Sequence, residues 1–175
     1  MGKPGMNEWM ADKRWSDRFL PEIKQILGLY LIGEPPQEED SERNTDLMVL
    51  KMDAVRIACR VRRHEYYERY PGDITIRAGR PSGMKTELTK IIEGWGEYFF
   101  YGFSDKEEAR LEAWRLCDLK AFRIWLVRSI WPGRETPEIP GTKRNNNDDS
   151  SSFLAFKADE IPGFVIATKN VSSPK

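Results

Sequence analysis

The chain has 175 residues, of which 39% are hydrophobic and 32% are charged, and its formal net charge at pH 7 is zero. This length suits one domain that buries a core without help from disulfides or metals. A neutral chain has no overall field to attract nucleic acid or a membrane surface, so any electrostatic attraction must be local.

The cysteines, the histidine and the apolar runs indicate a cytoplasmic protein. Cys59 and Cys117 have no paired spacing and are expected to be buried thiols in a reducing compartment. His64 is the single histidine, which excludes a histidine pair at a zinc site. Residues 1–10 lack the apolar core of a signal peptide, and no apolar run approaches the ~20 residues that span a bilayer. We therefore expect no membrane partner.

The first predicted element follows a segment, residues 1–14, that is expected to be disordered. A helix is predicted from residue 15 or 16 to residue 31, because apolar residues recur there at steps of three and four. These residues are Leu20, Ile23, Leu27 and Tyr30. Residues 33–45 are rich in carboxylates and are expected to form a solvated loop.

Residues 46–63 predict two strands joined by a tight turn near Asp53 and Ala54. Side chains alternate between the two faces of a strand, and the second of these segments alternates clearly. One face would carry apolar residues and the other would carry arginines. The two sets are Ile57, Cys59 and Val61 on one face, and Arg56, Ala58, Arg60 and Arg62 on the other.

The rest of the chain predicts strands and helices in alternation. In chain order these are a polar turn segment at 64–72, a strand at 73–77, a loop at 78–84, a helix at 86–94, an aromatic strand at 97–103, a long helix at 105–131 capped by Ser104, a flexible loop at 133–151, short strands at 153–156 and 164–167, and a disordered tail at 168–175. This order predicts one α/β domain over residues 15–167, with a mixed central sheet flanked by helices on both faces.

The arginine face is the first candidate site. Residues 56–90 contain nine Lys or Arg and four Asp or Glu, an excess that contrasts with the neutral whole. Arginine binds phosphate through two parallel hydrogen bonds, so phosphate is the natural partner of such a face. The alternative is a face paired with carboxylates such as Glu38, Glu39 or Asp73. The phosphate-binding candidates are Arg56, Arg60, Arg62, Arg63, Arg77, Arg80 and Lys85.

The loop GRPSGMKTE, residues 79–87, is the second candidate. Its glycines and serine precede a helix, and with Arg80 and Lys85 it resembles an anion cradle. The Walker spacing and its Gly-Lys-Ser/Thr ending are absent. The alternative is an ordinary loop in which Ser82 or Thr86 caps the helix.

Carboxylates and aromatic residues provide two further candidates. Asp46, Asp73 and Glu87, with Lys90 one turn after Glu87, could hold Mg²⁺ and position a water molecule for phosphodiester attack. Carboxylates at strand starts are also routine solubilising residues. Exposed aromatic rings beside arginines can stack on unpaired bases, and the aromatic candidates are Tyr66, Tyr67, Tyr70, Trp95, Tyr98 and Tyr101. Most of these are expected to pack in the core or at its rim, with Tyr66 and Tyr67, in the polar stretch, as the exceptions.

A leading helix, a strand that opens with Asp, a hairpin partner, and then a helix and strand over roughly residues 18–131 resemble the PD-(D/E)XK, or restriction-endonuclease-like, nuclease superfamily. The resemblance implies Asp46 as a metal ligand. Arg60-Val61-Arg62 stands where the family has Glu-x-Lys, so Glu87 on the following helix would supply the second acid. Glu22 matches the accessory acid of the first helix. The stretches NTDLMVL and RIACRVRR also look like phage or prophage proteins of this kind.

These observations give one leading hypothesis and two alternatives. In a nuclease acting on DNA, Asp46 and Glu87 would hold Mg²⁺, Arg60 and Arg62 would bind the scissile phosphate, and Lys90 or Lys85 would stabilise developing charge. The first alternative is a nucleic-acid-binding protein without catalysis. The second is a protein-interaction or inhibitor module that binds a protein partner or forms a homodimer, with the acidic loop 34–42 and the loop 133–151 as contact surfaces.

Overall fold

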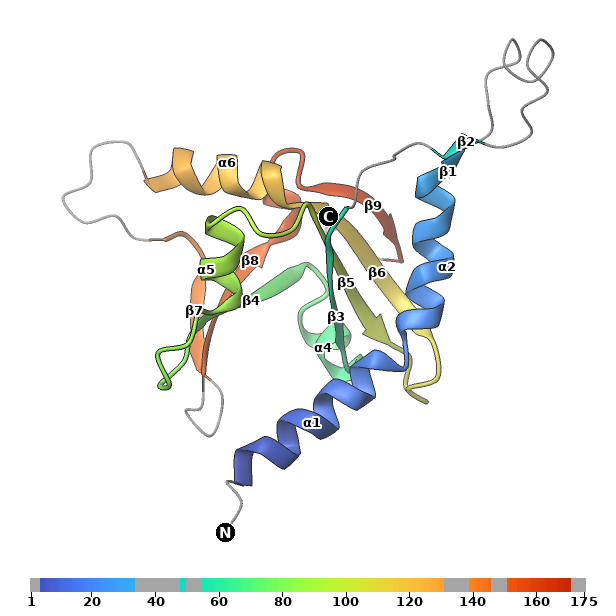
Figure 1. The fold of residues 1–175 in the computed structure, drawn as a ribbon, viewed down its shortest axis with the longest axis horizontal. Helices are drawn as coiled ribbons and strands as arrows, with labels where there is room; N and C mark the ends of the chain where they lie inside the picture. Colours follow the sequence, from blue (N-terminus) through green and yellow to red (C-terminus); the bar gives the residue numbers. More distant parts are fainter. Residues whose placement is uncertain (1–3, 34–47, 50–54, 131–138, 146–150, 171–175) are drawn as a thin grey trace. The chain divides into compact units, whose positions relative to one another are not determined.

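The computed structural model describes residues 4–33, 48–49, 55–130, 139–145 and 151–170 (Figure 1). Contacts within the chain divide it into two units, Met1–Ala54 and Val55–Lys175. The division falls inside the range 15–167 that the sequence predicts as one domain. None of the helices in these described ranges has the length and apolar character needed to cross a bilayer.

The described part of the first unit contains two helices where the sequence predicts one. Helix α1 spans Pro4–Asp17, so most of the segment 1–14 that was expected to be disordered is helical, and helix α2 spans Leu20–Leu31. Pro21 lies in the first turn of α2, where its missing N–H has no helical partner to lose. Ile23 and Leu27 are buried as predicted, but Leu20 is exposed. Strands β1 (Ile32–Gly33) and β2 (Met48–Val49) form an antiparallel pair.

The predicted hairpin over residues 46–63 is wrong, because β2 pairs with β1 and the next strand pairs elsewhere. Strand β3 (Ile57–Arg62) runs parallel to β5 (Tyr98–Ser104), with Arg60 opposite Tyr101. A parallel pair needs a crossover rather than a tight turn, and residues 63–97 supply it. The turn predicted at residues 53–54 lies outside the described residues.

The second unit has two sheets where the sequence predicts one central sheet. The mixed sheet has the order β3-β5-β6-β9, in which only the β3–β5 pair is parallel. The antiparallel sheet has the order β4-β8-β7. The remaining strands are β4 (Asp73–Gly79), β6 (Leu111–Asp118), β7 (Thr142–Asn145), β8 (Ser152–Lys157) and β9 (Val165–Lys169). The fold is therefore mixed α/β, as predicted, with a different arrangement of its strands.

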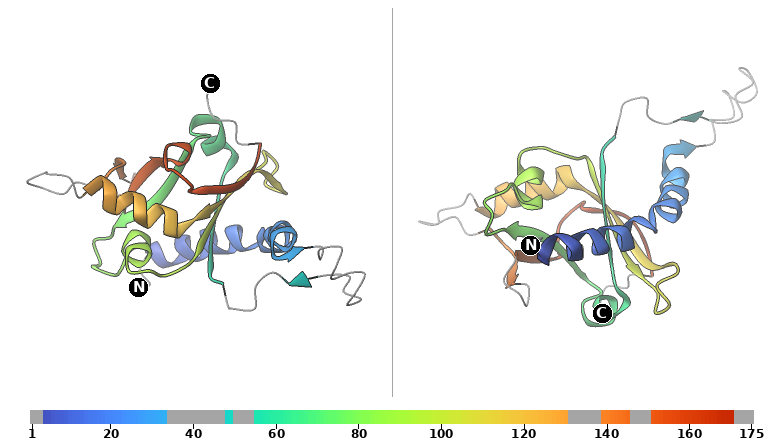
Figure 2. Two further views of the ribbon diagram at one scale, coloured as in Figure 1. Left: turned by 90° about the horizontal axis from the view of Figure 1, so that it is seen from above. Right: turned by 60° about the horizontal axis from the view of Figure 1, so that its bottom comes forward.

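Side chains from both sheets meet in one core, which explains why the mixed sheet is not covered by helices alone. Phe99, Tyr101 and Phe103 of β5 pack in the same cluster as Ile74 and Ile76 of β4. Helices α5 (Glu87–Ile92) and α6 (Leu119–Ile130) complete this cluster and lie side by side (Figures 1 and 2). The short helices α4 (His64–Arg69) and η1 (Ala158–Glu160) lie at the ends of strands.

The long helix predicted at 105–131 is wrong in its first half, which forms strand β6. Asp105 closes a β5–β6 turn by accepting hydrogen bonds from the backbone N–H groups of Ala109 and Arg110 at 2.7 and 3.2 Å. Ser104 is therefore a buried strand residue and not a helix cap. Asp118 caps α6 instead, since its carboxylate accepts from the N–H groups of Lys120 and Ala121.

Other predictions concern loops and cysteines. The side chain of Thr86 caps α5 by accepting a hydrogen bond from the N–H of Thr89 at 3.2 Å. This cap agrees with the alternative given above for residues 79–87, in which Ser82 or Thr86 caps the helix. Gly94 and Gly96, with φ of 91° and 82°, follow α5 in the left-handed conformation that ends many helices. Strand β7 lies within the segment predicted to be a flexible loop at 133–151.

Both cysteines are free, but Cys59 is exposed on β3, and only Cys117 is buried as expected.

Candidate anion-binding site

Basic side chains from β3, β4, α5 and the segments that flank them surround a cavity of about 430 Å³ within the second unit. We call it the cationic cavity. Six of its side chains carry a positive charge and one, Glu87, carries a carboxylate; the indole of Trp95, 63% exposed, lies at the same cavity. The basic residues are Arg56, Arg60, Arg77, Arg80, Lys85 and Lys90. The sequence predicted all of these as site residues, and the fold brings them together.

Glu87 organises the centre of the cationic cavity. Its Oε2 accepts a hydrogen bond from Nη2 of Arg60 at 2.7 Å and from the backbone N–H of Arg77 at 3.1 Å. Nη1 of Arg60 donates to the carbonyl oxygen of Thr75 at 2.7 Å. These contacts tie β3, β4 and α5 together and hold the Arg60 guanidinium in one orientation.

The remaining charges of the cationic cavity do not balance. Arg56 pairs with Glu97 at 3.5 Å, and Lys85 pairs with Glu93 at 2.7 Å. The charged side-chain groups of Arg77, Arg80 and Lys90 have no carboxylate within 4.0 Å among the residues that the structure describes. Burial lowers the pKa of Arg77, and the positive charges of Arg80 and Arg60 lower it further. A bound anion would relieve this repulsion.

The arginines that were predicted to share one face of β3 line two different cavities. Arg60 lines the cationic cavity, whereas Arg62 lines a second cavity. Arg63 takes no part in either lining and forms an ion pair with Glu108 at 2.6 Å. Of the carboxylates weighed as partners of this face, Asp73 pairs with Lys157 at 2.5 Å. Glu38 and Glu39 lie outside the described residues.

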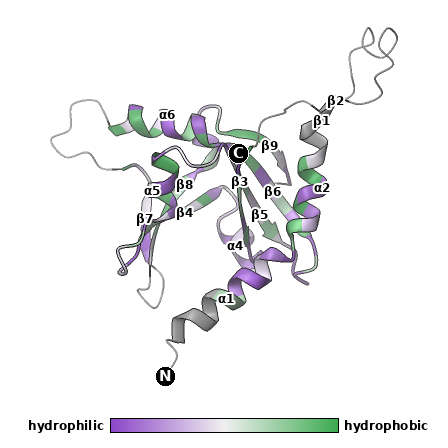
Figure 3. Cartoon of the chain, viewed as in Figure 1, coloured by the Kyte–Doolittle hydropathy of each residue, from purple (hydrophilic) through white to green (hydrophobic). Residues whose placement is uncertain are grey.

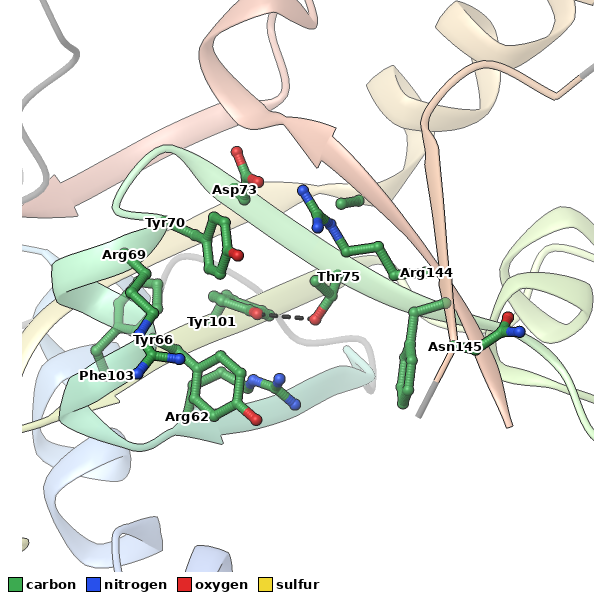
Figure 4. Close-up of a pocket in the computed structure, with 12 residues that line it drawn as sticks. Arg62, Tyr66, Arg69, Tyr70, Asp73, Thr75, Tyr101, Phe103, Arg144 and Asn145 are labelled. Carbon is green, nitrogen blue, oxygen red and sulfur yellow. Dashed lines mark hydrogen bonds between the residues drawn. The ribbon is translucent and has the colours of Figure 1, made fainter. Parts of the chain in front are cut away.

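The second cavity, of about 330 Å³, also lies within the second unit and is lined by tyrosines and arginines (Figure 4). We call it the aromatic cavity. Its tyrosines come from α4 and β5, and its arginines come from β3, α4 and β7. Figure 3 shows that α4 and β7 are largely hydrophilic. The residues used below are Arg62, Tyr66, Arg69, Tyr70, Tyr101 and Arg144.

Tyr66 is exposed at the aromatic cavity, as predicted, but Tyr67 is not part of it. Tyr67 packs against Phe103 with ring centroids 5.3 Å apart, and its hydroxyl donates to the carbonyl oxygen of Asn170. Tyr70 takes its place, with 38% of its surface exposed. Tyr70, the C-cap residue of α4, belongs to the aromatic residues that the sequence offered as candidates, but it was expected to pack in the core or at its rim.

The described carboxylates do not fit a magnesium site. Oε2 of Glu87 accepts from both Arg60 and the backbone N–H of Arg77, so the Arg60 guanidinium would compete with a metal ion for that oxygen. Asp73 belongs to the other cavity. Within the described ranges there is no group of three side chains that could hold a metal ion. Asp46, the other predicted ligand, lies outside those ranges.

His64 lies at the start of α4, between two carboxylates. Its Nδ1 is 2.6 Å from Oε2 of Glu112, and its Nε2 is 3.0 Å from Oε1 of Glu68. Desolvation lowers the pKa of His64, but the hydrogen bonds and charges of Glu68 and Glu112 outweigh it, so the pKa is raised. When the ring is protonated, these two contacts hold α4 against Glu112 of β6.

Replacing His64 with glutamine is expected to destabilise the protein in acid more than in alkali. Because the pKa is raised in the folded state, the stabilisation is fully present below the unfolded value of about 6.5 and is lost as pH rises through the folded pKa. Urea unfolding at about pH 5.5 and about pH 9 measures the difference between wild type and His64→Gln. Equal destabilisation at both pH values would show that the ion pairs contribute nothing.

Comparison of the chain with models of protein families, with curated proteins and with solved structures finds no match. The function is therefore inferred from the chemistry of the two cavities.

Proposed function

We propose that this protein binds nucleic acid through phosphate contacts in the cationic cavity. The observation that carries the proposal is the set of three cations, Arg77, Arg80 and Lys90, that face one cavity with no carboxylate partner among the described residues. Arg60 adds a guanidinium whose orientation is fixed by Glu87 and Thr75. Guanidinium groups bind phosphate bidentately, and a phosphate would offset the excess charge.

The exposed indole of Trp95 supports a polynucleotide over a free inorganic anion. It lies at the same cavity as the cations and presents an apolar ring to solvent. Proteins that bind unpaired nucleic acid combine a positively charged groove with aromatic rings on which bases stack. A simple phosphate ion would use the cations but not the ring.

A nuclease of the PD-(D/E)XK type is the second candidate, and DNA would then be the substrate. It needs Glu87 and Asp46 as metal ligands, whereas Glu87 here accepts from Arg60. Binding is therefore the function that the described geometry supports better. The predicted phage or prophage origin and the cytoplasmic location are compatible with either candidate.

Changing Arg77 and Arg80 together to glutamine is expected to weaken nucleic-acid binding and its dependence on salt. Each lost phosphate contact reduces the slope of log K against log salt by about 0.9 for duplex DNA and about 0.7 for single strands. The double variant should therefore have a slope smaller by about 1.8 or about 1.4. Fluorescence anisotropy of labelled DNA over a salt series measures the slope.

The control is the double variant Arg110→Gln and Arg128→Gln, which removes the same charge from exposed positions outside both cavities. It should retain nearly the wild-type slope. If both double variants reduce binding equally, the attraction is general and not located in the cationic cavity. If the wild type binds neither duplex nor single-stranded DNA, the proposed function is wrong.

A further inference from the structure

The aromatic cavity combines flat rings with positive charge. Figure 4 shows the rings of Tyr66, Tyr70 and Tyr101 around one space, with the guanidinium of Arg62 beside Tyr66. That guanidinium lies 4.0 Å from the Tyr66 ring centroid, and the guanidinium of Arg144 lies 5.1 Å from the Tyr70 ring centroid. Tyr66 and Tyr70 are 40% and 38% exposed, so both rings remain accessible to a ligand.

The charges of the aromatic cavity are also uncompensated. Arg62, Arg69 and Arg144 have no carboxylate within 4.0 Å in the described parts of the chain. Asp73 is the one carboxylate of the lining, and it pairs with Lys157. The Nε–H of Arg62 is buried and has no acceptor. The cavity therefore suits a ligand that carries both a planar ring and negative charge.

The cavity also offers polar groups that could contact the edge of such a ring. The hydroxyl groups of Thr75 and Tyr101 lie 3.0 Å apart and both residues line the cavity. Each hydroxyl can donate or accept, so the pair can adapt to different base edges. A ligand with only apolar atoms would leave these groups and the arginines unused.

The two cavities are linked by one strand. Arg60 and Arg62 are two residues apart on β3, which separates them by roughly 6.6 Å along the strand. Arg60 lines the cationic cavity and Arg62 lines the aromatic cavity. One extended chain that crosses β3 could therefore place a phosphate in the first and a ring in the second.

We infer that the aromatic cavity receives an unpaired base, so that the ligand of this protein is single-stranded nucleic acid. This inference rests on the proposed function, since the cationic cavity would bind the adjoining phosphates. A base within a duplex has both faces covered by its neighbours, and only a base removed from the stack can enter a cavity of this kind. Stacking on Tyr66 and Tyr70 tolerates any base, so the preference is for unpaired strands and not for a sequence.

The test compares single-stranded and duplex DNA of about 12 nucleotides, a length in the range that such sites cover. The variant Tyr66→Leu with Tyr70→Leu removes both rings. Its affinity for the single strand should fall by about tenfold or more, and its affinity for the duplex should not change. The control, Tyr66→Phe with Tyr70→Phe, retains the rings and should bind the single strand within about twofold of wild type.

Thermal unfolding of each variant confirms that it is folded before binding is measured. Equal single-strand affinity of the leucine variant and wild type would overturn the inference while leaving the proposed function in place. The inference would also be overturned if the leucine variant lost equal affinity for the single strand and the duplex. The same conclusion would follow if the phenylalanine variant bound the single strand as weakly as the leucine variant. Salt-dependent binding that is lost only in the Arg77 and Arg80 variant would support the proposed function alone.

Discussion

Replacing Glu87 with glutamine is expected to strengthen nucleic-acid binding by about tenfold at low salt. The change removes the one negative charge of the cationic cavity, while the glutamine oxygen can still accept from the backbone N–H of Arg77. A unit charge about 6 Å from a phosphate, at an effective dielectric constant of about 20, contributes roughly 2–3 kcal/mol before screening by salt. Anisotropy titrations at low and high salt measure the gain.

Glu107→Gln is the matched control, because it removes a carboxylate from an exposed position outside both cavities. It should change the affinity little. The nuclease hypothesis predicts a different outcome for Glu87. If wild type cleaves plasmid or single-stranded DNA in the presence of Mg²⁺ or Mn²⁺, and both Glu87→Gln and Asp46→Ala abolish cleavage, then Glu87 is a metal ligand and the binding proposal is incomplete.

Replacing Arg115 with alanine is expected to lower the free energy of unfolding by about 3 kcal/mol. Arg115 is 1% exposed on β6, where its Nη1 donates to the carbonyl oxygen of Gly72 at 3.0 Å. Its Nη2 lies 3.4 Å from Oδ2 of Asp159. Alanine would leave a cavity and deprive the Gly72 carbonyl of its donor. For a chain of this size the melting temperature should fall by about 6–12 °C.

Arg115→Met separates the effect of volume from the effect of charge. Methionine fills most of the space of the arginine stem, and a buried charge replaced by an apolar side chain of similar size often costs little. We expect a loss of about 1 kcal/mol, from the missing hydrogen bond to Gly72. Urea unfolding measures both variants. Equal losses for alanine and methionine would show that the contacts of the guanidinium, and not the packing of the stem, stabilise this region.

Local sequence patterns predicted those elements that can be recognised without knowing which strands pair with one another. Strand β3, the strand that begins at Asp73, and the cap at Thr86 all follow from neighbouring residues, although burial along β3 does not alternate as predicted, since Cys59 is exposed. The aromatic strand predicted at 97–103 corresponds to β5 at Tyr98–Ser104, in which Phe99 and Phe100 are both fully buried. The excess of basic residues between 56 and 90 predicted the cationic cavity, because β3, β4 and α5 follow one another along that stretch.

The errors arose where distant segments decide the structure. Strand β6 buries Ala113 and Cys117 in the core and Trp114 and Leu116 on the opposite face, so it lacks the polar alternation of an exposed strand and resembles a helix. Its pairing with β5 and β9 overrides that local pattern. The aromatic cavity could not be predicted in full, since Arg144 reaches it from β7, far along the chain from Tyr70.

Strand β3 lies at the edge of the mixed sheet, with β5 as its single neighbour in the sheet order. Edge elements open more readily than central ones, and such local openings are in equilibrium with the closed state. Since Arg60 and Arg62 both belong to β3, detachment of this one strand would dismantle both cavities together. A ligand that binds these cavities only while β3 is paired with β5 would therefore stabilise that pairing. The polynucleotide proposed as ligand would reduce the opening of this outermost strand.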